Sequence, residues 1–583
     1  MNKTEKIASI VLGAVLVWYL FTQGAKKPAA PASQVPETAQ AVQAAQTEPA
    51  AQPASPQTAP QTAQANTPQA AQANAQQAAQ APALPETPEQ FVTLENDDLT
   101  LVLSTWGGVV KSATLRKYAQ GKGEVGDANP PVVFDFSSSP LGATDGPVIA
   151  YSFEQESPTE VVFFFNGAAR RKVSLADNYL VTYQDDLVGA SSISIGAMAM
   201  GADKNDLLSV DSFRPDPKGG KVIHHSEGDS PLKGYLAGGI SGGCSGTKSA
   251  AGLPAQVRID YPGAQTYVAL KNRFFVTALV STSAPNLGFS ATVARDLASA
   301  AYRPQSVSAR ILLDSSAKCD SVKSVFYVGP KKQALLWDLG LKDVMEFGMW
   351  RWICYPLVWV LNVFYAVVPN FGVAIILLTI LVRLLFWPLT HKSTVGMKKM
   401  QEIQPLMKEI QAKYKDNPQR MQQETFALYR EHKVNPMSSC LPMLIQIPVF
   451  IALFNVLRSA VELRYAPFLW IGDLSQPEGL FASWFPFGGL NILPILMAAT
   501  MALQSALTPS GGDPKQQRMM VVMMPLMMLF MFYSFPSALS LYWTLSQVVS
   551  IVQMWLIRRS TRRAAGMPEV IDPPQTRQMR RHG

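Results

Sequence analysis

The sequence predicts a polytopic α-helical membrane protein that also carries a large antiparallel β-sandwich. With 583 residues the chain is too long for one domain. Hydrophobic residues make up 48% of it, and most long apolar runs lie after residue 345, which indicates a membrane half. Before that point, short segments rich in β-branched and aromatic residues indicate strands.

Residues 1–24 are expected to form an N-terminal transmembrane signal anchor. Lys3 and Lys6 precede an apolar run that ends near Trp18 and Tyr19, which suit a membrane interface. A cleaved signal peptide is the alternative, but no clear small-residue cleavage site follows directly. The N-terminus is therefore expected in the cytoplasm.

Residues 25–90 are expected to be a disordered tether rich in Ala, Gln, Pro and Thr. Such a composition buries too little apolar surface to offset its chain entropy. A flexible segment of this kind reaches about 40–45 Å.

Residues 91–340 are expected to form the β-sandwich and a closing helix. Turn residues separate five strand-like runs, at 99–108, 161–167, 179–184, 267–281 and 306–314. The run 329–340 has a helical pattern and closes the domain.

Residues 341–368 are apolar and crowded with Trp and Tyr, as is typical of a membrane interface. We expect an amphipathic helix lying along the membrane surface. Arg351 and Pro356 interrupt the run, which disfavours the alternative of a further spanning helix.

Five further apolar segments are candidate transmembrane helices: 369–390, 436–459, 490–508, 519–535 and 538–557. They are separated by segments 391–435, 460–489 and 509–518 and followed by a tail, 558–583. Segment 391–435 carries nine Lys/Arg against five Asp/Glu, and the tail carries seven Arg against two acids. The positive-inside rule places both in the cytoplasm and the β-sandwich outside. Because these basic regions flank apolar spans, they favour anionic lipid or a ribosome over DNA as partners.

The cytoplasmic segment 391–435 is expected to be a helical hairpin. Met397, Met400, Ile403 and Met407 recur at three- and four-residue spacing, which indicates a narrow apolar seam. Pro405 is expected to kink the first arm or to mark a local helix start.

Enzyme signatures are lacking: the sequence has no nucleophile elbow, phosphate loop or metal motif, so no cofactor or metal is expected. The adjacent His224 and His225 are expected in a loop turn rather than in a metal site. Cys244 and Cys319 could pair in an exported domain or remain free thiols.

Arg383 is the only charged residue in the apolar run 371–387. A long side chain could snorkel to the cytoplasmic headgroups, roughly 13 Å along the helix. The alternative is a water-filled recess open to the cytoplasm, which lowers the cost of burying an arginine. The polar side chains available to it are those of Thr379, Gln446, Asn455, Gln504, Ser546 and Gln547.

A methionine-rich run, 518–531, places seven Met residues on a broad helix face. Methionine suits surfaces that contact varied apolar partners, although ordinary packing against lipid or helices is equally compatible. Tyr542 and Trp543 add aromatic side chains that can contact an apolar chain.

Four segments together resemble the YidC/Oxa/Alb family of membrane protein insertases, in its Gram-negative form: 370–390, 435–454, 461–475 and 535–547. The resemblance implies a five-helix core around a hydrophilic groove that opens to the cytoplasm and to lipid. It implies that Arg383, Thr379 and Gln446 line the groove. It also implies a greasy slide, along which a substrate segment moves, formed by Phe450, Ile447, Met531, Tyr542 and Trp543.

The same resemblance implies a non-enzymatic insertase and chaperone in the bacterial inner membrane, with its large domain in the periplasm and its C-terminus in the cytoplasm. Expected partners are nascent membrane proteins, the Sec translocon, the ribosome through the basic regions, and membrane lipids. Two rival functions remain open. A transporter or channel would be revealed by substrate flux, and a structural envelope protein would depend on residues 91–330.

Overall fold

The computed structural model describes residues 85–121, 125–126, 129–186, 190–200, 208–215, 221–225, 232–236, 254–295, 304–314, 316, 321–434, 441–481, 489–507 and 514–564. The expected anchor 1–24 lies outside these residues, as does nearly all of the tether 25–90. Cys244 and Cys319 also lie outside them, so their pairing stays a prediction.

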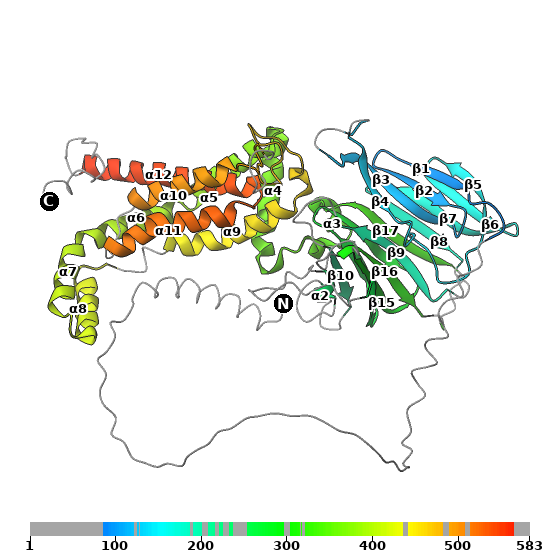
Figure 1. Cartoon of the computed structure of the whole chain (residues 1–583), viewed down its shortest axis with the longest axis horizontal. Helices are drawn as coiled ribbons and strands as arrows, with labels where there is room; N and C mark the ends of the chain where they lie inside the picture. The colour runs from blue at the N-terminus through cyan, green and yellow to red at the C-terminus, as the bar shows by residue number, and fades with distance from the viewer. Residues whose placement is uncertain are drawn as a thin grey trace, which may run out of the picture. The chain divides into compact units, whose positions relative to one another are not determined.

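Three sheets, in which every strand pair is antiparallel, make up the β-rich part of the chain (Figure 1). The first sheet contains β1 (Phe91–Glu95), β2 (Leu99–Ser104), β3 (Val109–Ala119) and β4 (Pro131–Asp135). The nine-stranded sheet runs in the order β11 (Lys221–His224), β10 (Ser209–Arg214), β13 (Tyr267–Lys271), β14 (Phe275–Thr282), β17 (Val322–Pro330), β8 (Leu180–Asp185), β7 (Ala168–Ala176), β6 (Glu160–Phe165) and β5 (Ser152–Ser157). The third contains β12 (Gln256–Pro262), β15 (Asn286–Arg295), β16 (Pro304–Leu313) and β9 (Ser192–Ala199).

Alternating side chains build the core of this domain. In β1, Val92 and Leu94 are buried while their neighbours are exposed, because successive side chains of a strand point to opposite faces. Strands in the middle of the nine-stranded sheet are buried on both faces, as the fully buried β13 shows. Aromatic rings pack in this core, and Tyr183 of β8 meets Phe326 of the neighbouring β17 edge to face.

The apolar run 267–281, expected as one strand, is a hairpin of β13 and β14. Asn272 forms the turn, because its side-chain oxygen accepts hydrogen bonds from the backbone N–H groups of Phe274 and Phe275. Asparagine favours such turns because its side chain satisfies nearby amides. The turn places Arg273 at the end of the hairpin.

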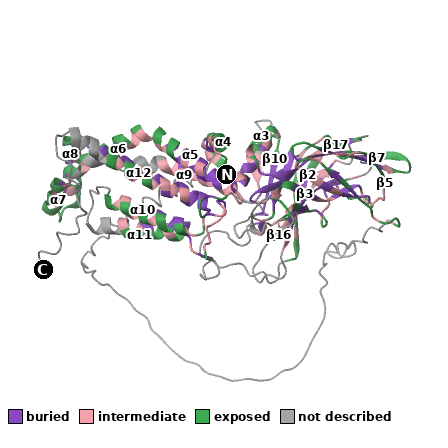
Figure 2. Ribbon diagram, turned by 90° about the horizontal axis from the view of Figure 1, so that it is seen from above, coloured by how far each residue is buried: buried purple, intermediate pink, exposed green. Residues whose placement is uncertain are grey.

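The helices after the sheets begin with α3 (Gln333–Asp338), a shorter element than the expected run 329–340. They continue with η1 (Lys342–Met345), η2 (Gly348–Trp350), α4 (Arg351–Val367), α5 (Phe371–Leu385), α6 (Trp387–Glu402), α7 (Gln404–Lys413), α8 (Pro418–Glu431), α9 (Leu441–Ser459), η4 (Val461–Leu463), α10 (Ile492–Leu507), α11 (Pro514–Phe532) and α12 (Ser537–Ala564). Helices α10 and α11 each have both buried and exposed positions (Figure 2).

The segment 369–390, expected as a single helix, is broken at Phe386. Helices α5 and α6 meet there at 58°. Pro388 follows in the first turn of α6, where its missing N–H and its ring prevent a continuous helix. Pro405 similarly lies in the first turn of α7, which is the local-start alternative.

One helical segment among the described residues, Ser537–Ile557, is long and apolar enough to cross a membrane, and the bent pair α5–α6 could add a second. Helix α10 has 16 residues and is therefore about 24 Å long, short of the roughly 30 Å hydrocarbon core. The helix lengths therefore give only weak support to the expectation of five spanning helices in this half.

Two arginines join the β domain to the helices. Arg273, on the β13–β14 turn, donates to the carbonyl oxygens of Arg458 at 2.9 Å and Ser475 at 2.6 Å. It thereby satisfies a carbonyl group at the end of α9, where the helix itself offers no donor. In the opposite direction, Arg464 donates to the carbonyl of Ala119, at the end of β3, at 2.7 Å.

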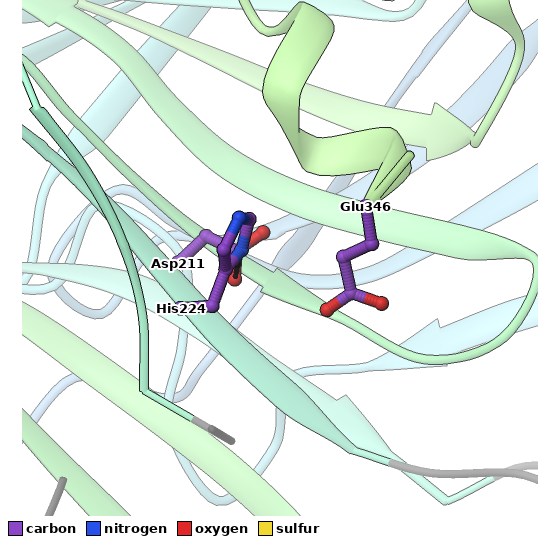
Figure 3. Close-up of side chains that lie close together, drawn as sticks. All are labelled: Asp211, His224 and Glu346. Carbon is purple, nitrogen blue, oxygen red and sulfur yellow. Dashed lines mark hydrogen bonds and ion pairs between the residues drawn. The ribbon is translucent and has the colours of Figure 1, made fainter. Parts of the chain in front are cut away.

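A buried charge network lies where β10, β11 and β13 meet η1. Lys271 donates to Asp211, to Glu346 at 2.8 Å and to the carbonyl of Val344 at 3.0 Å. His224 contacts Asp211 from the other side at 2.9 Å. Figure 3 shows that Asp211, His224 and Glu346 converge, as metal ligands would. The Lys271 ammonium already supplies the positive charge that a metal ion would bring, so this cluster is an ion-pair network.

His224 also corrects an expectation. It ends strand β11 rather than lying in a loop turn, and it pairs with Asp211 on β10. His225, which follows the strand, contacts Ser212 at 3.0 Å instead. Adjacent positions at a strand end send their side chains to different partners.

The network predicts acid-dependent stability. Burial would raise the pKa of Glu346, but the ammonium groups of Lys271 and Lys331 lower that pKa to about 2 from an ordinary 4.5. A carboxylate with a lowered pKa stabilises the fold above its unfolded pKa, and this stabilisation is lost as the pH falls from about 4.5 to 2. We expect Glu346→Gln to reduce the loss of thermal stability across that window. An unchanged pH profile in the variant would contradict this assignment.

Candidate functional site

Arg383 lies in the last turn of α5 and reaches across to α12. Its Nε donates to the Ser546 hydroxyl oxygen at 2.9 Å, and its Nη2 donates to the same oxygen. None of the ion pairs in the described part of the chain includes Arg383. A neutral hydroxyl group, rather than a carboxylate, therefore accepts from this half-buried guanidinium.

Gln446 and Tyr542 form a second polar pair between α9 and α12. The Gln446 amide donates to the Tyr542 hydroxyl at 2.7 Å. Tyr542 is 1% exposed, so its ring is enclosed. Tyr542 lies one turn before Ser546 on α12, and its place on the greasy slide stays a prediction. We call Arg383, Ser546, Tyr542 and Gln446 the groove network, after the groove that the family resemblance implies.

Thr379 lies one turn before Arg383 on α5 and is fully buried. Its hydroxyl donates to the carbonyl of Ile375 in its own helix at 2.7 Å. This i−4 bond satisfies the hydroxyl locally. The structure therefore places Thr379 beside the network without a hydrogen bond to Arg383.

Aromatic rings gather on the side of α9 that faces α11 and α12. Phe450 meets Trp543 edge to face at 4.8 Å and Phe532 at 5.9 Å between ring centroids. Phe454 and Phe535 extend the cluster with a centroid distance of 5.6 Å. The sequence singled out Phe450 and Trp543 and missed the other three rings, although Phe450 and Phe454 have the four-residue spacing of one helix face.

The remaining positions that are expected on the greasy slide differ in exposure. Met531 is 43% exposed, and Met527 and Met523 are exposed one and two turns earlier on α11. Ile447 is half-buried on α9. Exposed flexible thioethers on one helix face give α11 an apolar surface that can adapt its shape.

The helical hairpin forms its own small core, separate from the groove network. Ile403, Met407, Leu428 and Val434 are buried together, and Met400 packs partly against them. The side chain of Met397 lies outside the described residues. Met407 also accepts a hydrogen bond from the Tyr429 hydroxyl at 3.2 Å.

Together these elements present a positive charge beside apolar rings, in helices whose apolar faces are exposed. A charge in such surroundings attracts acidic groups more strongly than one in bulk water. The arrangement is suited to binding an apolar segment that carries an acidic residue, and it has no nucleophile or general base poised for catalysis among the described residues.

Comparison with known proteins defines the class of protein to which this chain belongs. The family described as "60Kd inner membrane protein" matches residues 363–564, and the family described as "YidC periplasmic domain" matches residues 247–360. The protein is thus an inner-membrane protein with a β-rich periplasmic domain of antiparallel sheets. The chain belongs to the YidC family of membrane protein insertases.

Membrane protein insertase YidC of Pelobacter propionicus is 33% identical over 82% of this chain and 88% of its own length. The insertases of Syntrophobacter fumaroxidans and Syntrophus aciditrophicus are 43% and 46% identical, over 54% and 42% of their own lengths. A crystal structure of an active YidC insertase with its first transmembrane domain resolved has 19% identity and a TM-score of 0.34, covering 80% of this chain and 92% of that one.

The groove network predicts a stability difference between two serines on α12. Ser546→Ala removes the acceptor of the Arg383 guanidinium, and we expect the unfolding free energy in detergent to fall by about 1.5–3 kcal/mol. Ser550→Ala is the matched control, because the Ser550 hydroxyl donates only to the carbonyl of Ser546 in its own helix at 2.9 Å. The control should change stability by about 0.5 kcal/mol or less. Equal denaturation midpoints for the two variants would rule out a structural role of the Arg383–Ser546 pair.

Proposed function

We propose that this insertase receives nascent membrane segments in a hydrophilic groove lined by Arg383, Gln446 and Thr379, and releases them sideways into lipid. The observation that carries the proposal is the bonding of Arg383 to the neutral Ser546. Because its charge is not cancelled by a carboxylate, Arg383 can attract an acidic residue of the incoming chain.

The groove network keeps this charge in place before a substrate arrives. Ser546 takes up two of the five donors of the guanidinium, which leaves others for a substrate carboxylate. Tyr542 and Gln446 satisfy each other nearby, so the substrate does not need to break that pair. A preorganised site of this kind loses less conformational freedom on binding.

Apolar transfer supplies the driving force, so no nucleotide is needed. Each CH₂ group that leaves water contributes roughly 0.8 kcal/mol. The greasy slide gives the segment an apolar path, with Phe450 and Trp543 as rigid rings and Ile447 and Met531 as adaptable neighbours. We assign Tyr542 to the boundary between the groove and the slide, because its ring is packed while its hydroxyl is hydrogen-bonded.

The topology we propose has an N-terminal anchor and a multi-pass core whose basic segments face the cytoplasm. Helices α6, α7 and α8 would guide the chain toward the groove, with Met397, Met400, Ile403 and Met407 along the hairpin seam. The basic tail supports a modest contact with the ribosome. Action beside the Sec translocon is compatible with sideways release and forms part of the proposal.

Insertion of a single-span substrate with an acidic N-terminal tail into proteoliposomes tests the function. We expect Arg383→Lys to retain insertion, because the charge remains. We expect Arg383→Ala to reduce the insertion rate by about tenfold, because a partly screened charge pair contributes roughly 1–4 kcal/mol. Protease protection measures the inserted fraction.

Arg351→Ala is the matched control. Arg351 is exposed in the first turn of α4 and bonds to Asp343 at 3.1 Å, outside the groove network. This variant should insert the substrate at the wild-type rate. The proposed role of Arg383 is wrong if Arg383→Ala also inserts at that rate, and the insertase activity itself is in question if wild-type proteoliposomes do no better than empty liposomes.

A further inference from the structure

A cavity of about 460 Å³ lies where the periplasmic domain meets the start of α5. Its walls come from the end of β3, the residue before α3, the α4–α5 connection and the loop after α9. This volume falls within the range of about 300–1,000 Å³ that is usual for small-molecule sites. The groove network does not include any of the residues that line it.

Positive charge dominates the cavity wall. Lys117, Lys332 and Arg464 line it together with a single carboxylate, that of Glu462, and the Lys117 ammonium also pairs with Asp98 at 2.6 Å. Burial raises the pKa of Glu462, and Lys332 partly offsets that rise. The lining therefore carries an excess of cations suited to an anion.

The beginning of α5 strengthens this preference. Asn370 and Phe371 line the cavity, and Asn370 caps α5 by accepting a hydrogen bond from the Val373 amide at 3.1 Å. The first N–H groups of a helix point outward along its axis, and the helix dipole makes this end positive. An anion in the cavity would thus face both lysine ammonium groups and a helix N-terminus.

An apolar surface adjoins the cavity on α4. Val367 is 74% exposed two residues before Pro369 in the cavity wall, and Val363 is exposed one turn earlier. Tyr365 stacks on Phe371 with ring centroids 3.9 Å apart and forms the wall between the two surfaces. A ligand with a phosphate head and acyl chains fits this arrangement, because its head meets cations while its chains meet valines.

We propose that this cavity binds the phosphate of an anionic phospholipid from the periplasmic leaflet of the inner membrane. Lys117 and Lys332 hold the phosphate, Arg464 shapes the site through its bonds to the β domain, and the acyl chains lie along α4. The bound lipid would connect the periplasmic domain, α4 and α5 at the membrane surface.

The test is native mass spectrometry of the full-length protein in detergent with added phosphatidylglycerol. We expect Lys117→Gln and Lys332→Gln each to weaken lipid binding about fivefold, and the double variant about 25-fold, from the typical contribution of one basic residue near an anionic lipid. Diacylglycerol with the same acyl chains, which lacks the phosphate, should bind no better to the wild type than to the double variant.

Lys323→Gln is the matched control, because Lys323 is an exposed lysine at the opposite end of β17, roughly 25–30 Å along the strand from Lys332. It should bind phosphatidylglycerol like the wild type. Wild-type binding by the double variant would overturn the site. Inorganic phosphate that binds as tightly as phosphatidylglycerol would overturn the lipid assignment in favour of a soluble phosphate.

Discussion

One arginine, Arg383, lies among the apolar helices of the membrane part, where a neutral hydroxyl group holds it. Burying a guanidinium without partners is costly. Here Ser546 supplies the nearest acceptor, and α12 presents it because α5 and α12 pack against each other. A carboxylate at that position would cancel the charge, whereas a neutral hydroxyl holds the side chain and leaves the charge uncompensated. The Arg383–Ser546 bond therefore links α5 to α12, and the Gln446–Tyr542 bond links α9 to α12.

The periplasmic domain is tied to the same helices by reciprocal bonds. Arg273 donates from a β-hairpin to carbonyl groups at the end of α9 and in the following loop, and Arg464 donates from that loop to the end of β3. Backbone carbonyl groups at helix and strand ends lack partners within their own elements, so these contacts stabilise both sides at once. Because α9 also carries Gln446 and Phe450, the hairpin turn is connected through one helix to the groove network and the aromatic cluster.

Local patterns in the sequence predicted a β-rich domain followed by apolar helices, and the antiparallel sheets confirm the first of these. The sequence patterns predicted the wrong element where a single side chain overrides the local pattern. The run 267–281 is continuously strand-forming, yet Asn272 turns it by bonding two following amides. The α5–α6 break had a visible signal in Pro388, but apolarity favoured one helix. Ser546 was one of six candidate partners for Arg383, and only the packing of residues 163 positions apart selected it.

A charge exchange between the protein and its substrate tests the central claim most directly. A single-span substrate would carry either its acidic residue or a lysine at the same position, and each would be presented to the wild type and to Arg383→Glu in proteoliposomes. We predict that Arg383→Glu fails to insert the acidic substrate and recovers insertion of the lysine substrate, because attraction is restored with the signs reversed. Equal insertion of both substrates by both proteins would contradict an electrostatic role for Arg383, and so would loss of both substrates in Arg383→Glu when the variant is folded.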